Sequence, residues 1–170
     1  FDSRSGLQTL ARDIAATPPD AVVLQYNPFS YGRWGLNLTL PGLLPSLRRH
    51  APETRLAVMV HEPFVPVESL RFAVFTTWQR WQLWQLGRAA DTLFFSIAPW
   101  VGRFGAWFPN TPCHLLPVGS NIPVAPTARA RMRAQLGFDV GTTVLGFFGS
   151  AHESRDLALL RRALNERVIV

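Results

Sequence analysis

A glycine between an apolar run and a charged helical segment is the most informative feature of this sequence. Residues 142–148 form an apolar run of strand length, Gly149 follows, and residues 156–167 have the composition of a helix. A glycine turn lets the backbone approach an anion closely, and the free N–H groups and dipole of a following helix attract that anion. The pattern predicts a phosphate-binding turn, although many such turns in α/β domains bind nothing.

His61 and Glu62 come directly after a second apolar run, residues 55–60. Ligands of open α/β sheets bind at the carboxyl ends of the strands, so His61 is placed to contact a ligand in a cleft. The alternative is a loop histidine bonded to backbone. Glu62 could bind a hydroxyl group of an acceptor, and its alternative is a solvated surface carboxylate.

Two further segments carry polar residues just after predicted strands. Asn27 and Tyr31 follow residues 21–26 in a loop rich in aromatic and polar side chains, which can hold a sugar by stacking and hydrogen bonding. Ser120 and Asn121 follow residues 114–118 and could line a cleft, while Asn121 could equally cap a turn.

Composition sets broad limits on the class of protein. The chain has 170 residues, 48% of them apolar, and a formal net charge of +6 carried by arginine without any lysine. The arginines are mostly scattered and no aromatic ladder interleaves with them, so we expect no nucleic-acid partner. One cysteine makes neither an internal disulfide nor a metal cluster, and we expect no metal and no cofactor. Without a membrane-spanning run or a signal peptide, the expected location is the cytoplasm.

Helical and extended patterns alternate along the first 122 residues. Because apolar strands separated by helices build parallel sheets, the sequence predicts an α/β fold with a Rossmann-like parallel sheet and flanking helices. We expect helices over 5–16, 40–49, 68–89 and 99–108, and strands over 21–26, 55–60, 91–96 and 114–118.

The pattern changes after Ile122. Prolines and a short arginine-rich helix over 128–136, with Gly137 as its C-cap, indicate a linker. A further strand over 142–148 and helix over 156–167 start a second unit. We therefore expect three parts: a Rossmann-like domain over 1–122, a linker over 123–141, and the first β-α unit of a second Rossmann-like domain over 142–170.

Five segments in order resemble GT-B glycosyltransferases, in particular the large retaining family four that uses nucleotide sugars. They are VMVHEPF (58–64), LGRAADTLFFSIAPW (86–100), LPVGSNIP (116–123), LGF (136–138) and VLGFFGSAHESRD (144–156). The resemblance implies that the first domain binds the acceptor and that the second begins the donor domain. It also implies a chain incomplete at both ends, inactive alone, whose partners are a nucleoside diphosphate sugar and a glycan, lipid-linked or small-molecule acceptor.

The resemblance also implies roles for particular residues. A histidine at the position of His61 lies close to the transferred sugar, and the Gly149 turn contacts the donor diphosphate. This chain departs from the family at the turn, since Ser150 replaces an arginine and Asp156 falls near the position of a lysine. Arg155 is the cation nearest to that position, and its fork of donors suits a phosphate.

The predicted helix over 68–89 carries two apolar stripes. Leu70, Val74, Trp78 and Trp81 form one, and Phe72, Phe75, Leu83 and Leu86 form the other. We expect this helix to be mostly buried, by core packing or a subunit contact, with a peripheral contact at the inner face of the membrane as the alternative. The alternatives to a glycosyltransferase are a standalone phosphate- or nucleotide-binding module and a protein-interaction module without catalysis.

Overall fold

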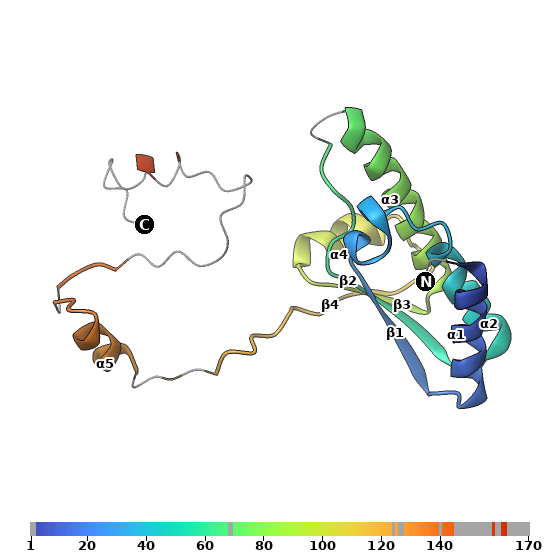
Figure 1. Cartoon of the computed structure of the whole chain (residues 1–170), viewed down its shortest axis with the longest axis horizontal. Coiled ribbons are helices and arrows are strands. Elements are labelled where there is room, and N and C mark those ends of the chain that lie inside the picture. Colours follow the sequence, from blue (N-terminus) through green and yellow to red (C-terminus); the bar gives the residue numbers. More distant parts are fainter. Residues whose placement is uncertain are drawn as a thin grey trace. The chain divides into compact units, whose positions relative to one another are not determined.

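The computed structural model describes residues 3–67, 70–123, 125, 128–139, 141–144, 158, 161 and 162. The chain divides into two compact units, Phe1–Ser120 and Asn121–Val170 (Figure 1). No helix among the described residues is both long enough and apolar enough to cross a membrane.

The first unit is built on a four-stranded parallel sheet whose strands lie side by side in chain order. The apolar runs over 21–26 and 55–60 each contain two valines, β-branched residues that favour strands. The first two strands have the bounds that the sequence predicts, and the last two are shorter. The strands are β1 (Ala21–Tyr26), β2 (Arg55–Val60), β3 (Thr92–Phe95) and β4 (Cys113–Leu115). The predicted Rossmann-like α/β class with a parallel sheet and flanking helices is confirmed.

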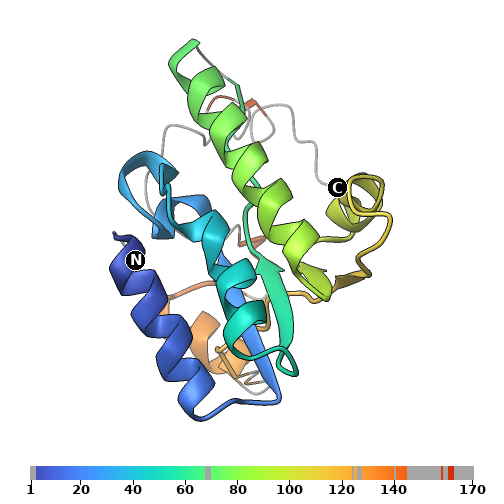
Figure 2. The ribbon, with the colours of Figure 1, turned by 90° about the vertical axis from the view of Figure 1, so that its right-hand side faces the viewer.

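The α-helices described in this unit lie on one face of the sheet (Figure 2), and each contributes residues to the same hydrophobic core. Each strand is added beside the previous one in the same direction, so right-handed crossovers bring every connecting helix to the same face. The expected helix over 40–49 instead starts with a 3₁₀ turn, Leu40–Gly42. The helices are α1 (Arg4–Ala16), α2 (Leu43–His50), α3 (Leu70–Ala89) and α4 (Ala98–Gly105).

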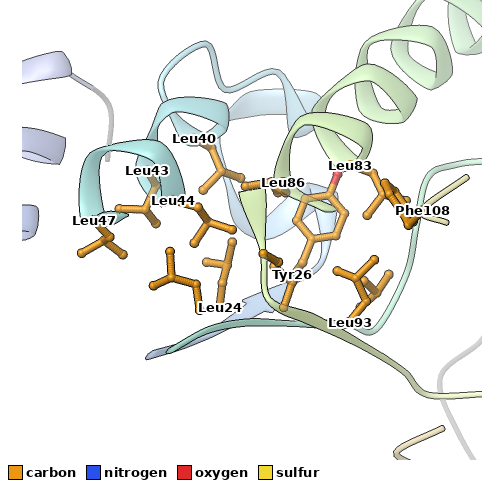
Figure 3. Packing of buried hydrophobic residues seen from close by; sticks show 14 of the residues in the cluster. Leu24, Tyr26, Leu40, Leu43, Leu44, Leu47, Leu83, Leu86, Leu93 and Phe108 are labelled. Atoms are coloured by element: carbon orange, nitrogen blue, oxygen red, sulfur yellow. The ribbon is translucent and has the colours of Figure 1, made fainter. Parts of the chain in front are cut away.

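The hydrophobic core lies between the sheet and these helices. Alternate residues of β1, β2 and β3 point into it, as the two-residue period of a strand requires. Figure 3 shows the ring of Tyr26 among leucines from α3 and β3. Phe95 and Phe104 stack with ring centroids 5.3 Å apart and join α4 to the sheet. The largest fully buried side chains include Tyr26, Phe95, Phe104, Leu40, Leu44, Leu56 and Leu83.

The packing of α3 differs from the expectation that this helix is mostly buried. Leu83 and Leu86 are buried in the core, as expected for their stripe. In the other stripe, Leu70 is 90%, Val74 66% and Trp81 41% accessible to solvent, and Trp78 is half-buried. The buried side of the helix is completed by polar side chains, Thr76, Gln79 and Gln82.

The second unit holds α5 (Ala128–Gln135), one residue shorter than predicted. Gly137 has a φ of 70°, and the N–H of Phe138 donates to the carbonyl of Arg133, so Gly137 ends the helix as predicted. Arg133 also donates to the carbonyl of Thr142 at 2.7 Å. Residues 142–144 of the predicted strand over 142–148 have no regular structure, and the rest of that strand lies outside the described residues.

Candidate functional site

His61 lies at the carboxyl end of β2, where the sequence places it. Its backbone N–H donates to the carbonyl of Tyr26 at 2.9 Å, which continues the ladder between β1 and β2 beyond the last paired residues. The hydroxyl of Ser96, just after β3, donates to the carbonyl of His61 at 3.4 Å. The histidine backbone is therefore held by both neighbouring strands at the edge where α/β sheets bind ligands.

The imidazole of His61 is half-buried and bonded to a side chain of β1. Its Nε2 lies 2.7 Å from Oε1 of Gln25. An amide oxygen only accepts hydrogen bonds, so in this arrangement Nε2 carries the proton and Nδ1 is left as an acceptor in the neutral ring. Among the described residues no group is bonded to Nδ1. The ring is thus oriented by Gln25, with one nitrogen able to accept a hydrogen bond from a ligand hydroxyl.

Sequence reasoning missed Gln25, although the signal was present. Gln25 pairs with Met59 in the parallel register, and His61 is two residues beyond Met59. Residues two apart in a strand point to the same face of the sheet. Gln25 and His61 therefore lie on the same face of the sheet once β1 and β2 are aligned.

The loop after β1 uses the polar groups of Asn27 and Tyr31 for its own structure. Oδ1 of Asn27 accepts from the N–H of Phe29 at 3.0 Å and caps the 3₁₀ turn Pro28–Ser30. The hydroxyl of Tyr31 donates to the carbonyl of Gln25 at 2.7 Å, and burial raises the pKa of Tyr31. Both residues lie next to the strand that orients His61, and their contact with an acceptor stays a prediction.

The second half of this loop is held against α3 by Gln79. Its Nε2 donates to the carbonyl of Trp34 at 3.2 Å, and its Oε1 accepts from the N–H of Val65 at 2.9 Å. Gly35 has a φ of 72°, and a Cβ there would meet Nε2 of Gln79 at 2.7 Å, so only glycine fits. A fully buried glutamine thus fixes the loops after β1 and β2 relative to each other, a role that its place among polar helix residues did not indicate.

The remaining predicted site residues do not join this cluster among the described contacts. Glu62 is exposed directly after His61. Ser120 is the last residue of the first unit and Asn121 the first of the second, and both are exposed. Gly149, Ser150 and Arg155 lie outside the described residues, so the predicted diphosphate turn stays a prediction.

The described residues hold no group of three histidine, cysteine or acidic side chains that could bind a metal ion. No protein-family model matches the chain, and no curated protein matches its sequence.

Proposed function

We propose that this chain contributes the acceptor-side domain of a GT-B glycosyltransferase, which transfers a sugar from a nucleoside diphosphate sugar to an acceptor hydroxyl. The proposal combines the order of the five sequence segments with the Rossmann-like parallel sheet. The observation that carries it is the position of His61, at the carboxyl end of β2 with its ring oriented by Gln25.

In this proposal His61 binds a sugar hydroxyl. Nε2 donates to Gln25 and Nδ1 accepts the hydroxyl proton in a hydrogen bond, which fixes the substrate at the sheet edge. Glu62, exposed beside it, adds an acceptor for a second hydroxyl. The charge that develops on the leaving diphosphate is stabilised by the predicted turn at Gly149 and Ser150, with Arg155 as its cation.

The test is sugar transfer by the full-length protein carrying His61→Ala. Loss of a hydrogen bond worth about 1–3 kcal/mol should lower kcat/KM by a factor of about 5 to 150. Release of nucleoside diphosphate is measured over a panel of nucleoside diphosphate sugars, with saccharide and lipid-linked acceptors.

His50→Ala is the matched control. Nδ1 of His50 bonds to the carbonyl of Ser46 at 2.8 Å at the end of α2, before β2 and therefore at the amino end of the strands. This variant should keep the kcat/KM of the unmodified protein. If the His61→Ala variant kept the activity of the unmodified protein, His61 would not be a substrate-binding residue. A protein that neither binds nor turns over any donor of the panel would contradict glycosyl transfer and favour a noncatalytic module.

A further inference from the structure

An apolar surface on α3 faces solvent. It is formed by Leu70, Val74 and Trp81, which lie on one side of the helix, and we call these three residues the outer stripe. A shallow groove of about 680 Å³ runs along it, lined by Ala73, Val74, Thr77, Trp78 and Trp81. Figures 1 and 2 show the amino-terminal half of α3 extending past the end of the sheet, so its outer side is open within the first unit.

On another side of α3, the loop after β1 adds exposed apolar side chains. The ring of Trp34 stacks on Phe75 of α3 with centroids 5.8 Å apart and an interplanar angle of 2°. Trp34 remains 42% exposed, and Leu38 further along the same segment is 79% exposed. Trp34 and the outer stripe thus leave apolar side chains exposed along two sides of α3.

All charged residues of α3 are positive. Between Leu70 and Ala89 the sequence has three arginines and no acidic residue. The guanidinium of Arg80 lies 5.2 Å from the ring centroid of Trp107, and that of Arg88 lies 4.5 Å from the ring centroid of Trp84. Arg88 and Trp84 both belong to α3, and arginine and tryptophan on a helix with an exposed apolar stripe are typical of helices that lie in the interface of an anionic bilayer.

We infer that the outer stripe of α3 docks on the surface of a membrane containing anionic phospholipid. The apolar side chains enter the interface, and the arginines of the same helix attract the lipid phosphates. A second copy of this chain fits less well, because pairing α3 with itself brings arginines toward arginines without any acidic residue on the helix to offset them. The inference does not depend on glycosyl transfer.

Sedimentation with vesicles tests the inference on the full chain. We expect binding to vesicles of phosphatidylcholine mixed with phosphatidylglycerol, and much weaker binding to phosphatidylcholine alone or at high salt. Leu70→Ser combined with Val74→Ser should lower the partition constant about tenfold to a hundredfold, because two exposed side chains no longer enter the interface. Arg80→Gln combined with Arg88→Gln should lower it about fivefold or more and reduce the salt dependence.

Leu116→Ser combined with Val118→Ser is the matched control. These residues are 48% and 66% exposed in the first unit but lie outside α3, and their loss should leave binding unchanged. Three results would overturn the inference: no binding to anionic vesicles, equal loss of binding in both serine double variants, or equal binding to neutral vesicles. A dimer seen by light scattering that dissociates in the Leu70 and Val74 variant, without vesicle binding, would make a second copy the occupant.

Discussion

The two faces of the sheet differ most clearly in β1 and β3. On the face toward the helices, Leu24, Val58 and Phe95 are 7%, 0% and 0% exposed. On the opposite face Val23 is 50% exposed and Phe94 is half-buried, since no described helix of the first unit packs there. Neighbouring apolar residues of one strand thus have very different surroundings. How much a residue contributes to the free energy of unfolding depends on which face of the sheet its side chain occupies.

The central strand reduces this contrast. Met59 of β2 is only 4% exposed although it points to the uncovered face, because β1 and β3 flank it. At the edge strand β1 the uncovered face is open to solvent, and there Gln25 reaches His61. The uncovered face therefore carries the polar contact of the candidate site, while the covered face supplies stability.

Phe94 and Phe95 give the sharpest test of this comparison. Phe95→Ala should lower the free energy of unfolding by about 3–5 kcal/mol, because a fully buried ring stacked on Phe104 is lost. Phe94→Ala should lower the free energy of unfolding by about 1 kcal/mol, since that ring is only half-buried. Its centroid lies 5.8 Å from the centroid of the His114 ring. Urea denaturation measures both. Equal losses would show that the second face is also covered in solution.

The adjacent residues Gln25 and Tyr26 extend the test to polar pairs. Nε2 of Gln82 donates to the hydroxyl of Tyr26 at 3.2 Å inside the core, and burial raises the pKa of Tyr26 far above its usual range. Tyr26→Phe should cost about 1–2 kcal/mol, because a buried amide loses its partner. Gln25→Ala breaks the exposed bond to His61 and should change stability by about 0.5 kcal/mol or less.

A double variant separates the buried bond from packing. Oε1 of Gln82 has no hydrogen-bond partner in the described structure. Tyr26→Phe combined with Gln82→Leu removes all of these buried polar groups together, so it should be at least as stable as Tyr26→Phe alone. A double variant less stable than Tyr26→Phe alone would contradict this expectation, because removing the remaining buried amide would then cost more than its desolvation.

Much of the first unit follows from local sequence. The bounds of β1 and β2 were predicted correctly because β-branched runs end at strong breakers, Pro19-Asp20 before β1 and Pro63 shortly after β2. The parallel sheet followed from the alternation of strands and helices. The same alternation was enough to predict that His61 lies at the end of a strand.

The parts that sequence did not predict depend on tertiary arrangement. Which face is covered follows from the order of the strands, which local patterns do not contain. The buried side of α3 was predicted wrongly because Gln79 and Gln82 are polar residues. In the structure they are buried and form hydrogen bonds with β1 and with two loops. With those polar groups turned inward, part of the apolar surface of the helix was left outside, and periodicity alone does not reveal this inversion.

The smallest expected effect concerns Asp91, which joins the helix layer to the sheet. Its carboxylate accepts from Arg48 of α2 at 2.6 Å and from the N–H of Leu56 in β2 at 2.7 Å. Burial acts to raise the pKa of Asp91, but the hydrogen bonds from Arg48 and Leu56 and the charges of Arg48 and Arg55 outweigh it and lower the pKa.

A lowered pKa in the folded state means that Asp91 stabilises the protein when ionised. Its contribution is present above the unfolded value of about 3.9 and is lost as the pH falls through the lower folded value. Because the two side chains are 38% and 44% exposed, solvent screening limits the pair to about 0.5 kcal/mol. Asp91→Asn should therefore reduce the free energy of unfolding slightly near neutral pH, and the difference from the unmodified chain should shrink in acid. A difference that grows on acidification would mean that Asp91 does not join the two layers through its charge.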